Sequence, residues 1–94
     1  MSVEIQDWDV SEYLDSEEAI ASFLNAVIEE NDPELLQAAI GAVAKARGMT
    51  DIAKSAGVGR ASLYKSLSTE GNPSFQTIAK VANSMGLKLE FVPC

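Results

Sequence analysis

Hydrophobic residues recur along the chain at the spacing of one helical face. Between residues 16 and 30, and again between residues 33 and 47, they fall three and four positions apart. This spacing is typical of helices that bury one side and leave the other in water. The two stripes are Ile20, Phe23, Leu24, Val27 and Ile28, and then Leu36, Ala39, Ile40 and Val43. The pattern therefore predicts two long helices in the first half of the chain.

Helix-starting and helix-ending residues set the limits of these two helices. Asp15 followed three residues later by Glu18 is typical of a capping box, which predicts the first helix start. Asp32 and Pro33 predict the start of the second helix, because proline costs nothing in a first turn. Gly48 is expected to end this helix, because glycine readily adopts the backbone conformation of a helix C-terminus.

Three shorter helices are predicted in the second half. One covers residues 51–56 with Thr50 as its N-cap, and the next covers residues 60–67. The last begins after Ser74 and ends at Gly86. Its expected buried residues are Phe75, Ile78, Ala79, Ala82 and Met85.

The two ends of the chain follow other patterns. Residues 3–5 alternate and could start an extended segment, and they lead into an arm whose Trp8 and Tyr13 we interpret as anchors on the core. Residues 87–92 alternate with a period of two, which predicts a strand that Pro93 closes. Because a single strand needs a partner, it is expected to pair with residues 3–5 or with a second chain.

The predicted fold class is all-α, with five helices and a short C-terminal β-strand in one domain, residues 1–94. Its parts are an acidic N-terminal arm and helix (1–31), a helical core (32–86) and the strand (87–92). A chain this short buries only about 60–65% of its unfolded surface, which favours a homodimer that buries more.

The net charge of −7 hides an uneven distribution of charged residues. Residues 1–44 carry eleven acidic side chains and no basic one, whereas residues 45–94 carry all seven basic side chains and three acidic ones. The first half therefore has a charge of −11 and the second half a charge of +4. The net acidity argues against nucleic acid, but the split predicts two surfaces with different partners.

Composition excludes several functional classes. No apolar run approaches the ~18 residues of a membrane span, and the first residues do not match a signal peptide. One cysteine, Cys94, fits a reducing cytoplasm. Without histidine the chain cannot form a Cys/His zinc site, a Ser-His-Asp triad or a Cys-His dyad. We therefore expect no enzymatic activity, no metal, no cofactor and no small-molecule substrate.

Residues 50–65 have the composition of a helix-turn-helix. Ala53 is small where two helices would touch, and Gly57 can take the positive φ of a tight turn. The second of these helices would present its N-terminal residues to the major groove. The candidate DNA-binding residues are Thr50, Arg60, Ala61, Tyr64 and Lys65.

Two simpler interpretations remain open for this segment. Short helices joined by glycine occur in any small helical bundle, whether or not it binds DNA. Tyr64 and Lys65 could also lie at the edge of the core and on a solvated face, with no ligand.

The chain resembles the addiction-module antidote proteins over nearly its whole length. These are small HigA-like antitoxins of bacterial toxin–antitoxin pairs, with a lambda-repressor-like helix-turn-helix. The most distinctive match is Leu63-Tyr64-Lys65 followed by Gly71-Asn72-Pro73. The resemblance implies a cytoplasmic, dimeric antitoxin that binds operator DNA and represses its own operon. It also implies a toxin partner of the RelE/ParE superfamily, typically an mRNA-cleaving ribonuclease.

Two positions depart from that family's usual pattern. Asp51 replaces a common glutamine, and its charge would be repelled by a phosphate. Gly59 replaces a common serine and is a weaker helix cap. They favour the alternative function, a protein-interaction module (an antitoxin or adaptor) whose helix-turn-helix does not bind DNA.

The acidic first half suggests a surface for a basic partner. An RNA-cleaving toxin is expected to have a basic cleft, which an acidic antitoxin could cover. The candidate toxin-binding residues are Glu17, Glu18, Glu29 and Glu30. The simpler interpretation, a solvated face that only keeps the chain soluble, has equal weight.

Overall fold

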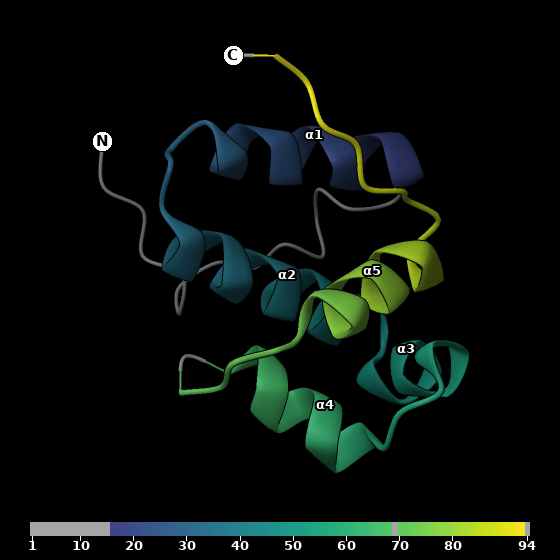
Figure 1. Cartoon of the computed structure of the whole chain (residues 1–94). Coiled ribbons are helices and arrows are strands. Elements are labelled where there is room, and N and C mark those ends of the chain that lie inside the picture. The colour runs from purple at the N-terminus through teal and green to yellow at the C-terminus, as the bar shows by residue number, and fades with distance from the viewer. Residues whose placement is uncertain (1–15, 69, 94) are drawn as a thin grey trace.

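The computed structural model describes residues 16–68 and 70–93, which form five α-helices and no strand. They are α1 (Glu17–Ile28), α2 (Pro33–Arg47), α3 (Met49–Ala56), α4 (Arg60–Leu67) and α5 (Phe75–Ser84). In Figure 1, α1 lies above α2, and α3 and α4 lie at the opposite end of the molecule from α1. The prediction of five helices is confirmed.

Side-chain caps fix where the two long helices begin. The Ser16 hydroxyl accepts a hydrogen bond from the Ala19 N–H at 3.1 Å, so α1 starts at the next residue. Asp32 caps α2 as predicted, because its carboxylate accepts from the N–H groups of Glu34 and Leu35 at 3.1 and 3.2 Å. The predicted cap Asp15 lies outside the described residues.

The start of α3 differs from the prediction. Gly48, with φ 107°, separates α2 from α3, and the Ile52 N–H donates to its carbonyl at 3.1 Å. Thr50 therefore lies inside the first helical turn and is not the N-cap. The reason is tertiary: Met49 is buried in the core, so the chain must re-enter a helix directly after Gly48.

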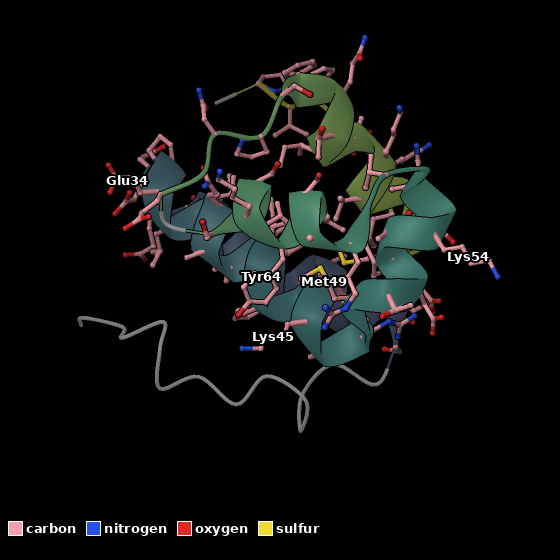
Figure 2. All side chains as sticks on the ribbon, turned by 90° about the horizontal axis from the view of Figure 1, so that it is seen from below. Glu34, Lys45, Met49, Lys54 and Tyr64 are labelled. Carbon is pink, nitrogen blue, oxygen red and sulfur yellow. The ribbon has the colours of Figure 1, made fainter. Side chains whose placement is uncertain are left out.

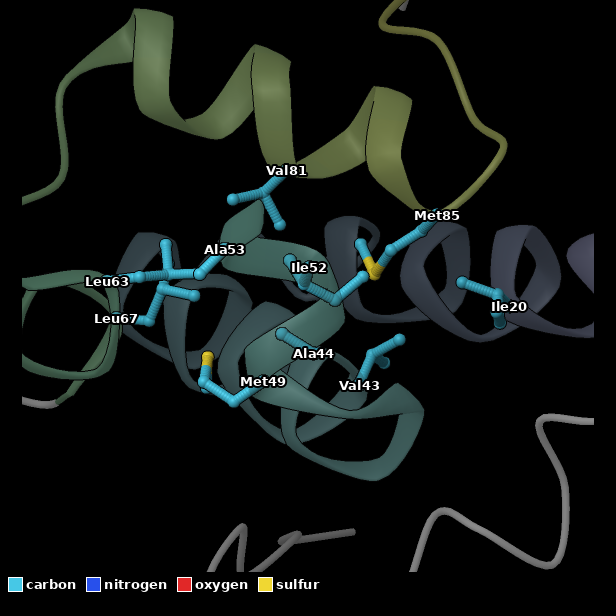
Figure 3. Packing of buried hydrophobic residues seen from close by; sticks show 10 residues of the cluster. All are labelled: Ile20, Val43, Ala44, Met49, Ile52, Ala53, Leu63, Leu67, Val81 and Met85. Carbon is cyan, nitrogen blue, oxygen red and sulfur yellow. The ribbon is translucent and has the colours of Figure 1, made fainter. Parts of the chain in front are cut away.

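All five helices contribute to one hydrophobic core, shown in Figure 3. α3 occupies its centre, since it contacts α2, α4 and α5, while α1 packs on α2. The buried cluster consists of Ile20, Val43, Ala44, Met49, Ile52, Ala53, Leu63, Leu67, Val81 and Met85.

Two residues assigned to the core by the sequence pattern lie on the surface. Ile28 is 51% exposed, because it is the last residue of α1 and the chain then turns away. Phe75 is 68% exposed, because it is the first residue of α5 and precedes the part that packs on α3. Val81, which the predicted stripe omitted, is fully buried.

The predicted strand at residues 87–92 does not form within the described part of the chain, where this segment is irregular. A strand is defined by hydrogen bonds to a neighbouring strand, and no described residue supplies them. One proposed partner, residues 3–5, lies outside the described residues, as do Trp8, Tyr13 and Cys94.

Candidate nucleic-acid interface

A glycine turn joins α3 to α4. Gly57 has φ 72°, in the left-handed region that favours glycine, and the Val58 N–H closes the end of α3 on the Ala53 carbonyl at 3.0 Å. A Cβ at position 57 would meet nothing within 4 Å, so the backbone angle and not a lack of space requires glycine here. Ala53 and Leu63 are buried where the two helices meet. The predicted turn and its two helices are confirmed.

α4 has one buried and one exposed side. Leu63 and Leu67 face the core, which turns the other side of this two-turn helix outward. All four predicted residues are exposed: Ala61, Tyr64 and Lys65 lie off the stripe of Leu63 and Leu67, and Arg60 lies in line with that stripe but is the first residue of the helix. The structure thus brings these four residues together on one helix, beginning at its N-terminus. Thr50 is exposed too, but it lies on α3.

Lys45 adds a cation that the sequence analysis did not assign to this surface. Its ammonium nitrogen lies 5.9 Å from the centre of the Tyr64 ring, within the range of a cation–π contact. Figure 2, which looks onto the α3–α4 end, shows these two labelled side chains next to each other. Lys45 is in the last turn of α2, and only the packing of α2 against α4 reveals that it joins Tyr64.

Gln37 holds the chain that follows α4. Its side-chain amide nitrogen donates to the carbonyl oxygens of Ser68 at 2.7 Å and Gly71 at 3.0 Å, and more weakly to that of Ser66 at 3.4 Å. One side chain of α2 thereby satisfies carbonyl groups that the end of α4 leaves open. The hydrophobic pattern assigns no role to Gln37, although a single amide beside an apolar stripe was a usable signal.

Gly71 is required by close packing in the same region. A Cβ there would collide with the carbonyl oxygens of Lys65 and Ser66, which are backbone atoms that cannot move aside cheaply. The Gly71-Asn72-Pro73 sequence therefore lets the chain pass directly against the end of α4. This close packing and the Gln37 hydrogen bonds together fix the orientation of α4 at the surface.

The basic side chains of this half are not paired with any acidic residue of the described chain. Within residues 16–68 and 70–93, no salt bridge is formed by any of the seven Lys and Arg residues, and no charged side chain is buried. The cations around α4 are Lys45, Arg60 and Lys65. Exposed cations that form no ion pair in the described chain are suited to contact phosphate groups.

The four candidate toxin-binding residues are exposed but do not form one cluster. Glu17 and Glu18 lie in the first turn of α1, whereas Glu29 and Glu30 follow its last residue. The 12-residue helix separates the two pairs by about 18 Å. Glu29 and Glu30 extend the negative end of the helix dipole, where acidic side chains are unfavourable, and α1 has no basic residue in its last turn.

These features describe a small, all-helical protein with an exposed basic helix at one end. The sequence profile of the family described as "Probable addiction module antidote protein" matches residues 4–93. A relative from Haemophilus influenzae, described as an uncharacterized protein, is 43% identical over 90 residues, which cover 96% of this chain and 93% of the relative.

The chain therefore belongs to the addiction module antidote family. No solved structure matches it. Within the described residues, no helix is both long and apolar enough to cross a membrane. The family supports an antitoxin role and a toxin as its partner.

Proposed function

We propose that the chain is the cytoplasmic antitoxin of a type II toxin–antitoxin module and the repressor of its own operon. In this proposal it binds operator DNA as a homodimer through a lambda-repressor-like helix-turn-helix, α3 and α4, of the HigA-like kind. The observation that carries it is that Arg60, Ala61, Tyr64 and Lys65 of α4 are all exposed.

In the proposed complex the N-terminal end of α4 enters the major groove. Arg60 is the first residue of α4 and can donate two hydrogen bonds to a guanine edge. Ala61 has only a methyl group, which allows close approach and contact with a thymine methyl. Lys65, Lys45 and the Tyr64 hydroxyl contact phosphates on either side, and the N-terminus of α3 around Thr50 contacts another.

A gel-shift titration with the upstream operator at low salt tests DNA binding. Arg60→Ala is expected to weaken sequence-specific binding by about 5- to 150-fold, the cost of one bidentate base contact. Lys80→Ala is the matched control, because Lys80 is an exposed cation on α5 and its loss changes the net charge equally. Absence of a specific shift with the wild-type chain, or equal losses in both variants, contradicts the proposal.

The toxin is proposed to be a basic ribonuclease of the RelE/ParE superfamily that contacts the acidic half of the chain. An enzyme that binds RNA needs a positively charged cleft, and residues 1–44 hold no base that would repel it. The two acidic pairs lie at opposite ends of α1. Either each pair contacts a separate part of the toxin, or only one pair contacts the toxin.

Separate charge reversals distinguish these possibilities. Glu17→Lys/Glu18→Lys and Glu29→Lys/Glu30→Lys are compared in a pull-down with the co-encoded toxin. Reversal of a contacting pair is expected to raise the dissociation constant by about tenfold or more, and more strongly at low salt. Retention of full toxin binding by both variants removes the proposed role of these four residues.

A second candidate function is a protein-interaction module that no longer binds DNA. It is favoured by Asp51, an exposed carboxylate in the first turn of α3, and by Gly59, which provides no side-chain cap for α4. In that case toxin capture persists in the experiment above, while the operator gives no specific shift at any salt concentration.

A further inference from the structure

The segment after α5 carries apolar side chains that the described part of the chain leaves uncovered. Leu87, Leu89 and Phe91 alternate with Lys88 and Glu90. Leu87 packs against the core, but Leu89 is about half exposed and Phe91 is 96% exposed. In Figure 1 the segment is the yellow trace that leaves α5 and continues to the C-terminus. Two exposed apolar side chains this close together are typical of an interaction surface.

The backbone of this segment is equally unpaired. The Leu87 N–H donates to the Ala82 carbonyl at 2.9 Å, and residues 88–93 make no further hydrogen bond within the described chain. Alternating side chains and open backbone groups are what a segment needs to pair with another strand. Pro93 has no N–H group, which limits the pairing segment to the six residues before it.

The order of charges shows which partner fits. In an antiparallel pair of two copies centred on Leu89, each Lys88 lies opposite the partner's Glu90, and each Leu87 lies opposite the partner's Phe91. A shift of the partner by two residues in either direction places Lys88 opposite the partner's Lys88, or Glu90 opposite the partner's Glu90. Opposite charges across a strand pair stabilise it and like charges destabilise it, so only the centred register is favoured.

We infer that two copies of the chain associate through residues 87–92, paired antiparallel about Leu89. The inference rests on the proposed function in one respect, since it assigns a surface to the proposed homodimer. A basic toxin fits less well, because Lys88 and Glu90 leave this segment without net charge. The N-terminal segment also fits less well, because residues 1–44 contain no base to pair with Glu90.

Sedimentation equilibrium on the full chain, without DNA or toxin, tests the inference. Lys88→Glu and Glu90→Lys each create two like-charge pairs, and each is expected to raise the dimer dissociation constant by about tenfold. An equimolar mixture of these two variants restores opposite charges across the pair and is expected to form a heterodimer of near wild-type affinity. The double variant Lys88→Glu/Glu90→Lys restores the pairing within one chain.

Lys80→Glu is the matched control, because it changes the net charge by the same amount as Lys88→Glu but lies on α5. It is expected to leave the dissociation constant within about twofold of the wild type. Circular dichroism should give the same helix content for every variant, since all the altered side chains are exposed.

Three results overturn the inference. They are a wild-type chain that is monomeric at about 100 µM, a mixture that does not recover the dimer, and equal losses in Lys88→Glu and Lys80→Glu. A failed operator shift alongside charge-dependent dimers overturns DNA binding alone. An operator shift by a monomeric chain overturns the dimer surface alone.

Discussion

The helices of this protein begin in two different ways. α1, α2 and α5 are each capped by a side chain that accepts a backbone N–H, from Ser16, Asp32 and Ser74 respectively. The N-cap positions of α3 and α4 are Gly48 and Gly59, and neither helix has a side-chain cap. The helices with open N-termini are also the two that we propose to contact DNA.

The comparison shows what holds the two uncapped helices in place. Each has only eight residues, too few to be stable alone in water, so their stability must come from packing against the other helices. Each also keeps N–H groups at its start without a partner, such as those of Ala61 and Ser62 in the described chain. An open helix N-terminus costs some stability, which is why Gly59 favours the second candidate function, but it also leaves donors for a phosphate, which favours the first.

The largest expected loss of stability comes from the variant that tests whether burial in the core keeps α4 in place. Leu63 is 1% exposed at the centre of the cluster, so Leu63→Ala leaves a cavity and should lower the free energy of unfolding by about 3 kcal/mol. Urea denaturation followed by circular dichroism measures this. Ser62→Ala, on the exposed side of α4, should stay within about 0.5 kcal/mol of the wild type. A similar loss in both variants would mean that packing does not hold this helix.

The next effect concerns the other end of α4. Gln37→Leu removes the donor shared by the Ser68 and Gly71 carbonyls and should cost about 2 kcal/mol. Hydrogen exchange should become faster for the amides of residues 66–71, because this turn then has fewer hydrogen bonds to α2 and opens more often. Gln76→Leu is the control, since Gln76 is exposed on α5. Unchanged exchange in the 66–71 turn would show that the Gln37 hydrogen bonds do not order it.

A smaller loss of stability is expected from removing a capping carboxylate, and a still smaller one from removing a carboxylate that does not cap. Asp32→Ala removes two hydrogen bonds at the start of α2 and should cost about 1 kcal/mol. Asp51→Ala removes an acid from the first turn of α3, where it makes no capping bond, and should cost at most about 0.5 kcal/mol. Thermal unfolding of the two variants gives the difference, and equal costs would remove the distinction between capped and uncapped helices.

The smallest change in stability is expected from adding a side-chain cap to α4, which lacks one. Gly59 has φ −71° and ψ 142°, angles that any residue adopts, and a Cβ there would approach nothing closer than 3.8 Å. Gly59→Ser should therefore raise the stability by about 0.3 kcal/mol, while Gly59→Ala provides no cap and should not. If an open N-terminus serves DNA binding, the serine variant should bind the operator no better despite its greater stability. Tighter binding would show that α4 was limited by its missing cap.

The limits of the helices were largely predictable because the signals that set them are local. Asp32, Pro33 and Gly57 act through their own backbone and the next few residues, and all three have the predicted roles. Thr50 was misassigned because the burial of Met49, a tertiary contact, moved the start of α3. Ile28 and Phe75 were placed in the core by periodicity alone, which does not show where a helix end leaves the core.

The exposed residues of α4 in the candidate site were predictable from the sequence. The residues of α2 that contact α4 and the turn after it were not. Helical spacing places Ala61, Tyr64 and Lys65 off the buried stripe of Leu63 and Leu67, and Arg60 is exposed because it is the first residue of α4. Lys45 and Gln37 belong to α2, and only the packing of α2 against α4 brings them to Tyr64 and to the turn after α4. Spacing along one helix carries no information about which other helix lies beside it.

The pattern of residue types was enough to predict the five helices, the turn at Gly57 and the division into an acidic and a basic half. These depend on local backbone preference and on counting charges, which need no knowledge of the fold. The packing of the helices was needed to show that Lys45 lies beside Tyr64, and that Gln37 and Gly71 support α4. The reason is that contacts between helices depend on how they pack, and packing is a property of the whole chain.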